Sequence, residues 1–254
     1  MKWNGRKVYM KGMEILKILC AGVLIVFSVY AFLIWEGILF IGEPINRNYS
    51  VRGIQVSAKY GKIDWTHLKK DMNLTFVYIK ATEGKKGKDS KFEQNWKLGK
   101  DSGLYVGAYH EFSLEQDGEK QAKNFISRVS ATPNTLPPMV KIVTVQEQDG
   151  IAPDPSKVKK QLKEYIRTIQ WYYNQTPIIY TDMDGYYQYI DREYQLYQLW
   201  IKNVTCYPFI KENRQWIFWE YKETQPWTYG GEKQIGLSVF DGSYKNFQSI
   251  FGVK

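Results

Sequence analysis

An uncharged apolar run near the amino end places the strongest constraint on what this chain can fold into. Residues 18–35 contain no Asp, Glu, Lys or Arg. At a rise of about 1.5 Å per residue, a helix of this length measures about 27 Å, close to the thickness of the hydrocarbon layer of a bilayer. A core helix would need a polar stripe or a larger domain around it, and the flanking sequence offers neither. We therefore expect one transmembrane helix over residues 18–41, with the rest of the chain folding without it.

Charged residues on the two sides of the run predict its direction in the membrane. Cations precede it and acids follow it: Lys2, Arg6, Lys7, Lys11 and Lys17 come before, and Glu36 and Glu43 after. The positive-inside rule then places residues 1–17 in the cytoplasm and the carboxyl-terminal part outside the cytoplasmic (inner) membrane, in the periplasmic or extracytoplasmic space. A cleavable signal peptide would have a shorter apolar region and a small-residue cleavage site, so an uncleaved signal-anchor is the better interpretation. Residues 42–50 are predicted to be a linker.

Residues 51–254 alternate short apolar β-rich runs with amphipathic patterns. Strands are predicted near residues 76–80, 105–109, 139–145, 177–180, 199–201 and 216–219, and helices over 65–72, 92–102, 119–129 and 156–173. Such alternation is typical of parallel βα units, in either a closed barrel or an open sheet. After Val56 the chain has no glycine-rich turn that would admit a pyrophosphate, which weakens a dinucleotide-binding interpretation.

Composition narrows the possible partners. The net charge is +9, but the lysines are scattered along the sequence. Basic and aromatic residues are not interleaved as they are in grooves that bind nucleic acid. A solvated basic surface explains this pattern, and we expect no nucleic-acid partner. The only histidines are His67 and His110, and neither lies near Cys206 in sequence, so we expect no metal site and no cofactor.

Several segments in combination carry a resemblance to a known family. They are residues 52–57 (Arg-Gly-Ile-Gln-Val-Ser), 63–65, 76–84 (Phe-Val-Tyr-Ile-Lys-Ala-Thr-Glu-Gly), 107–110, 136–138, 178–181 and 219–221. Together they resemble family 25 of the glycoside hydrolases, the lysozyme or N-acetylmuramidase family. The resemblance implies an irregular TIM-type β/α barrel over residues 51–254, with five βα units and three terminal strands, behind the single transmembrane helix. It also implies peptidoglycan as the ligand.

Catalytic carboxylates are the feature in which the chain departs from that family. Glycoside hydrolysis needs a carboxylic acid to protonate the leaving oxygen and a carboxylate to stabilise or attack the anomeric carbon. The resemblance places four carboxylates in the site, and the matching positions here hold other residues: Gln55, Lys141, Val143 and Gly236. We therefore expect a catalytically degenerate barrel.

Three glutamates are candidates for relocated acids. Glu147 would lie on the same face of an extended strand as Val143, but about 13 Å further along the chain. Glu111 and Glu220 occupy positions where the family more often has an apolar residue and a glutamine. Each of the three is also explained as an ordinary loop, surface or hydrogen-bonding carboxylate. If one of them acts, the chain is an active muramidase that hydrolyses the MurNAc-GlcNAc β-1,4 bond.

Ligand contacts are expected from residues on the barrel strands. Aromatic side chains stack on sugar rings, although in barrel strands they are as readily explained as core. The candidate ligand-binding residues are Glu83, Tyr78, Tyr109, His110, Lys141, Trp200, Trp219 and Tyr221. The partner is then peptidoglycan glycan or a cell-envelope protein. A third possibility is an envelope scaffold without affinity for sugar.

Overall fold

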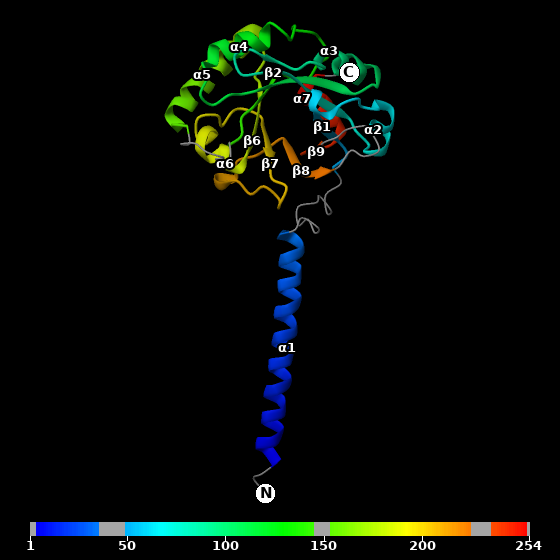
Figure 1. The fold of residues 1–254 in the computed structure, drawn as a ribbon, viewed down its shortest axis with the longest axis vertical. Coiled ribbons are helices and arrows are strands. Elements are labelled where there is room, and N and C mark those ends of the chain that lie inside the picture. Colours follow the sequence, from blue (N-terminus) through cyan, green and yellow to red (C-terminus); the bar gives the residue numbers. More distant parts are fainter. Residues whose placement is uncertain (1–3, 36–48, 145–152, 225–234, 253–254) are drawn as a thin grey trace. The chain divides into compact units, whose positions relative to one another are not determined.

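The computed structural model describes residues 4–35, 49–144, 153–224 and 235–252. The chain divides into two compact units, Met1–Ile41 and Gly42–Lys254 (Figure 1). Each unit is described by itself.

The first unit is a single helix, α1 (Asn4–Trp35). Its segment Gly12–Phe32 has a mean hydropathy of 2.4 and is long and apolar enough to cross a membrane. Large apolar side chains point outward all round it, and Phe27, for example, is 70% exposed. The helix begins at Asn4, well before the predicted start of the span at Ile18, and the predicted end of the span at Ile41 lies outside the described residues. The boundaries proposed for the cytoplasmic segment and for the linker stay predictions.

The second unit is an eight-stranded β/α barrel, as the sequence predicted. Strand β1 pairs in parallel with β2, and β9 closes the ring by pairing antiparallel with both β8 and β1. The remaining neighbours around the ring, β2, β4, β5, β6, β7 and β8, are parallel. The strands are β1 (Arg52–Val56), β2 (Phe76–Glu83), β4 (Tyr105–Glu111), β5 (Met139–Lys141), β6 (Ile178–Asp182), β7 (Leu199–Lys202), β8 (Phe218–Thr224) and β9 (Ile235–Phe240). A short strand, β3 (Gly87–Lys88), forms a hairpin with the end of β2.

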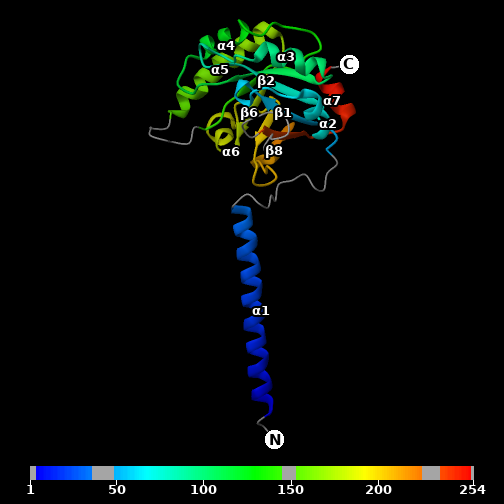
Figure 2. The ribbon, with the colours of Figure 1, turned by 45° about the vertical axis from the view of Figure 1, so that its right-hand side comes forward.

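Helices follow the first five barrel strands and cover the outside of the ring (Figure 2). They are α2 (Trp65–Asp71), α3 (Phe92–Asp101), α4 (Gly118–Ile126), α5 (Pro155–Tyr173) and α6 (Met183–Gly185), the last continued by a π-helical turn at Tyr186–Ile190. Aspartate side chains cap four of these amino ends: Asp64 before α2, Asp117 before α4, Asp154 before α5 and Asp182 before α6. The five βα units and three terminal strands expected from the family are present.

Side chains alternate between two cores along each strand. One face packs against the surrounding helices, and the other fills the barrel with aromatic rings. Inside the barrel the ring centroids of Phe76 and Phe218 lie 4.7 Å apart, and those of Tyr78 and Trp200 lie 5.4 Å apart. A last helix, α7 (Tyr244–Phe251), sends the fully buried Phe247 against this cluster. The sequence analysis did not anticipate α7.

Strand β5 is shorter than predicted. It ends at Lys141, although the amide of Ile142 still donates to the carbonyl of Tyr180 at 2.9 Å. Val143 follows without strand pairing and packs, partly buried, against the aromatic cluster inside the barrel. The predicted end of the run at Val145 lies outside the described residues.

Candidate active site at the carboxyl ends of the barrel strands

Polar side chains replace the aromatic ones toward the carboxyl ends of the strands. Two positions beyond Tyr78 the inward residue is Lys80, and two beyond Phe218 it is Glu220; the alternation of a strand keeps each pair on one face. Gln55 on β1 and Lys141 on β5 occupy the same end of the interior. The active sites of β/α barrels are built at this end from residues of different strands, so this is where a site is to be sought.

A hydrogen-bonded chain joins three of these side chains. The amide of Gln55 donates from Nε2 to Oε2 of Glu220 at 3.0 Å, and Nζ of Lys141 donates to Oε1 of Gln55 at 3.5 Å. The amide of Gln55 therefore connects a lysine with a carboxyl group that lie on strands β5 and β8. Two of the four positions where the family resemblance implied carboxylates, Gln55 and Lys141, are thus engaged with one another.

Glu220 is buried, with 4% of its surface exposed. Burial raises the pKa of its carboxyl above the usual value of 4.5, while the positive charges of Lys141 and Lys202 act in the opposite direction. The hydroxyl of Tyr180 also hydrogen-bonds Glu220. A buried carboxyl with a raised pKa is the type of group that acts as a proton donor in glycosidases.

Tyr180 was missed by the sequence analysis as a site residue. Its hydroxyl hydrogen-bonds both Glu220 and Gln55, and Nζ of Lys141 lies 4.7 Å from the centre of its ring. In the sequence, residues 178–181 (Ile-Ile-Tyr-Thr) indicate only the family resemblance. The pairing of the two strands is the signal that could have identified this residue, because Tyr180 on β6 lies directly beside Lys141 on β5.

The family resemblance implied a carboxylate at Gly236, and a side chain at this position would displace the carboxyl of Glu220. A Cβ atom built on Gly236 would lie 2.4 Å from Cδ of Glu220 and 2.6 Å from each of its carboxyl oxygens. The carboxyl group of Glu220 therefore fills the space next to the glycine. A carboxyl group from the neighbouring strand β8 thus lies beside a position on β9 where the resemblance implied one.

A second polar group ties Lys80 to two glutamates. Its ammonium contacts the carboxyl of Glu111 and lies 2.6 Å from that of Glu83. Burial acts to raise the pKa of Glu111, but the hydrogen bond and charge of Lys80 outweigh it and lower that pKa below the usual 4.5. Glu111 is therefore held ionised and is unsuited to donating a proton. Lys202 similarly pairs with Glu223 at 2.6 Å.

Three of the aromatic candidates lie inside the barrel. Tyr78 and Trp200 are fully buried, and Tyr109 is 3% exposed. The hydroxyl of Tyr78 donates to the carbonyl of Pro137 at 3.0 Å. Tyr109 lies nearer the site, with Nζ of Lys141 5.8 Å from its ring centre. In this arrangement these rings pack the core, and their contact with a sugar stays a prediction.

The other candidates point to the outer face of the barrel wall. His110 is fully buried there, its Nδ1 2.7 Å from the hydroxyl of Thr82 and its ring stacked on Tyr165. Burial lowers its pKa to about 4, so it is a neutral, structural histidine at physiological pH. Trp219 and Tyr221 belong to the same outer core, and Nε1 of Trp219 donates to the carbonyl of Asn203. We place none of these three in the site.

Glu147, the third candidate acid, lies outside the described residues. Within the described parts of the chain, no group of three His, Cys, Asp or Glu side chains lies together in a way that would hold a metal ion. The site that remains is made of Gln55, Lys141, Tyr180 and Glu220, with the pair of Lys80 and Glu111 beside it.

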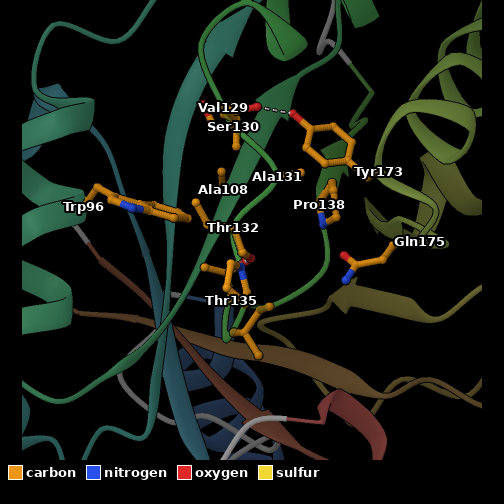
Figure 3. Close-up of a pocket in the computed structure, with 12 residues that line it drawn as sticks. Trp96, Ala108, Val129, Ser130, Ala131, Thr132, Thr135, Pro138, Tyr173 and Gln175 are labelled. Atoms are coloured by element: carbon orange, nitrogen blue, oxygen red, sulfur yellow. Dashed lines mark hydrogen bonds between the residues drawn. The ribbon is translucent and has the colours of Figure 1, made fainter.

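A separate pocket of about 250 Å³ lies against the outer side of β4, away from these residues (Figure 3). Trp96 of α3 points into it from one side and Tyr173 of α5 from the other, and the hydroxyl of Tyr173 donates to the carbonyl of Val129. Because its walls are mostly the loop 129–138, it forms no part of the interior of the barrel.

Comparison with known proteins agrees with this architecture. The model of glycosyl hydrolases family 25 matches residues 54–228. The YegX protein of Escherichia coli K12 is 26% identical over 215 residues, which are 83% of this chain and 77% of that protein. Lysozyme M1 of Streptomyces globisporus is 43% identical over 60 residues, 24% of this chain and 20% of that protein.

Among solved structures, a family 25 glycosyl hydrolase from Bacillus anthracis superposes with a TM-score of 0.73 and 32% identity. The superposition covers 79% of this chain and 93% of that one. With the family model matching more than half of its length and the same barrel present, this chain belongs to glycosyl hydrolase family 25.

Proposed function

We propose that the barrel binds peptidoglycan glycan without cleaving it, from a position anchored at the outer side of the cytoplasmic membrane. The observation that carries the proposal is the hydrogen-bonded chain from Lys141 through Gln55 to Glu220. It occupies the end of the barrel where a glycosidase of this family needs carboxylates.

Charge at this end opposes the chemistry of hydrolysis. The transition state of glycoside cleavage develops positive charge at the sugar ring, which a nearby carboxylate stabilises. Here a lysine stands at one of the carboxylate positions, and Glu111 is already paired with Lys80. A cation beside a developing cation raises the barrier, because preorganised charges act strongly in a partly buried site.

Lys141 also supplies a reason to expect binding. Within the described residues no carboxylate lies within ion-pair distance of its ammonium, which is held by Gln55 and by the rings of Tyr180 and Tyr109. Peptidoglycan peptides carry carboxylates, and a cation in place of an anion turns the preference of a cleft toward acidic groups. Glu83 is exposed at the end of β2, and its ion pair with Lys80 places it next to this site.

The experiment combines two measurements on the full chain in a neutral detergent. Incubation with purified sacculi is expected to release no muropeptides above the buffer rate, while sedimentation with the same sacculi removes the protein from solution. Release of muropeptides contradicts the loss of activity. Absence of both release and sedimentation leaves the interpretation as an envelope scaffold without affinity for sugar.

The second candidate function is an active muramidase that uses Glu220 as its acid. The observation in its favour is that the carboxyl of Glu220 fills the space at Gly236, where the family has a carboxylate. If muropeptides are released, Glu220→Gln abolishes the release under this interpretation, and Glu111→Gln and Glu147→Gln test the other two candidate acids in the same assay.

A further inference from the structure

A groove on the outside of the barrel is lined almost entirely by lysines. It is an open hollow of about 460 Å³ between the hairpin that joins β2 to β3 and the helix α4. Its lining residues are Lys85, Lys86, Lys88, Lys120, Lys123, Asn124 and Ser127. The five lysines are exposed, and they come from both walls of the groove.

Hydrogen bonds hold the two walls at a fixed separation. Nδ2 of Asn124, a buried residue of α4, donates to the carbonyls of Gly84 at 2.9 Å and Gly87 at 3.0 Å. Oε1 of Gln116 accepts from the amide of Lys85 at 2.7 Å. Gly84 has a φ of +49° and its missing Cβ leaves room for Gln116, so the turn is built to close against this side of the barrel. The lysines of the hairpin are therefore presented by a fixed loop.

Most of this positive charge is uncompensated. Lys123 pairs with Glu119 at 2.6 Å, whereas Lys85, Lys86, Lys88 and Lys120 make no ion pair with another described residue. Lys120 also lies in the first turn of α4, where the positive end of the helix dipole disfavours a cation. Like charges gathered in this way cost folding free energy, and an anionic ligand would offset that cost.

We propose that this groove binds a linear polyanion with repeating phosphodiester groups, carried by the cell wall. Lysine is a compact point charge with three rotatable donors, and it binds phosphate without a fixed geometry. Arginine is absent from the lining, so the groove has no planar forks that would select one shaped ligand. A row of such charges suits many equivalent phosphates along a chain.

The distribution of charge over two elements suits an extended polymer. The groove is an open hollow that lysines of the hairpin and of α4 line together, so an extended chain lying along it contacts both sets. The groove also borders the carboxyl end of β2, since Gly84 follows Glu83 directly. A wall polymer bound there would hold the barrel close to glycan. The groove shares no residue with the site at Lys141 and Glu220, so it is tested independently of the proposed function.

The test uses the full chain in nanodiscs and a fluorescent poly(glycerol phosphate) oligomer as the probe. In phosphatidylcholine nanodiscs we expect saturable binding that weakens with added salt. The variant Lys85→Gln/Lys86→Gln/Lys88→Gln should bind about tenfold more weakly, because it removes three exposed positive charges from the groove. The matched control Lys62→Gln/Lys70→Gln/Lys97→Gln removes the same charge from exposed lysines outside the groove, and it should bind within about twofold of the parent chain.

Three results would overturn the proposal: no binding, an equal loss in the variant and the control, or occupation of the groove by lipid. Occupation by lipid is measured, without polymer, as protection of the groove lysines from an acylating reagent. Phosphatidylglycerol has the same glycerol phosphodiester chemistry, so nanodiscs containing about one-third of it would protect Lys85, Lys86 and Lys88 if the membrane were the true partner. Unchanged acylation in those nanodiscs, with protection by the polymer in phosphatidylcholine nanodiscs, supports the polymer.

Discussion

The carboxyl group of Glu220 stands in the space that a side chain on Gly236 would need, 2.4 Å from the position of its Cβ. The two residues lie on adjacent antiparallel strands, β8 and β9. A side chain on Gly236 and the present position of the Glu220 carboxyl therefore exclude one another. A carboxyl group remains in the site, but it reaches in from another strand and hydrogen-bonds Gln55.

Restoring the four family carboxylates should not restore a robust enzyme. In the variant Gln55→Asp/Lys141→Asp/Val143→Glu/Gly236→Asp, the new aspartate at 236 collides with Glu220. We expect Gly236→Asp alone to lower the free energy of unfolding by about 1–3 kcal/mol from overpacking, with repulsion between two buried acids adding to it. Calorimetry measures this change, and adding Glu220→Ala should recover much of it. Strong lysis of sacculi by the quadruple variant would contradict this account.

The pKa of Glu220 predicts a specific pH dependence of stability. Because burial raises the folded-state pKa above the unfolded value near 4.5, the folded chain binds the proton more tightly. Stability then falls as the pH rises from about 4.5 through the folded pKa. Glu220→Gln should remove this dependence and gain stability relative to the parent chain over the same interval. Thermal melting of both chains between acid and neutral pH measures it, and parallel profiles would show that Glu220 does not titrate as proposed.

The pH dependence of stability that Glu111 contributes should have the opposite sign to that of Glu220. The folded pKa of Glu111 is lowered by Lys80 despite burial, so its contribution to stability is present above the unfolded pKa and is lost as the pH falls through the folded one. Glu111→Gln should lower the melting temperature at neutral pH and have progressively less effect in acid. Glu119→Gln, at an exposed pair on α4, is the control and should change little at any pH.

Phe247 is expected to be the most sensitive position on the last helix. It is fully buried against the interior cluster, with its ring centre 5.8 Å from that of Phe76. Phe247→Ala should lower the free energy of unfolding by about 3–5 kcal/mol. Ile250→Ala, on the same helix but 49% exposed, should change it by less than about 1 kcal/mol.

The site at Lys141 predicts how sacculus binding responds to charge. If the ammonium meets acidic groups of the wall, binding weakens with added salt and weakens further in Lys141→Asp. Lys141→Arg keeps the charge and should retain more of the binding than Lys141→Asp does. Circular dichroism checks that the fold survives in each variant. Binding that is unchanged by Lys141→Asp would remove this residue from the proposed ligand site.

The cations before the apolar helix and the acids after it predict that the carboxyl-terminal unit lies outside the cytoplasm. A phosphatase reporter fused after Lys254 should be active, because that enzyme folds only outside the cytoplasm. A fluorescent reporter that matures only in the cytoplasm should be dark at the same position. The reverse pair of results would overturn the proposed orientation.

The sequence by itself determined the apolar helix, the alternation of strands and helices and the family. These features depend on local patterns: an uncharged run long enough for a bilayer, period-two and period-3.6 alternation, and short motifs such as residues 76–84. The assignment of Gln55, Lys141, Val143 and Gly236 to the four carboxylate positions depends on the motif resemblance alone and stays a prediction.

Only the tertiary structure decided which side chains lie together at the carboxyl ends of the strands. Gln55, Lys141, Tyr180 and Glu220 lie on four different strands, and closure of the barrel brings them together. The same closure turns Tyr78 and Trp200 inward and His110 and Trp219 outward, because a strand alternates its faces and the sequence does not reveal which face becomes the interior. The space beside Gly236 was likewise invisible in the sequence, since it is filled by a side chain from the neighbouring strand.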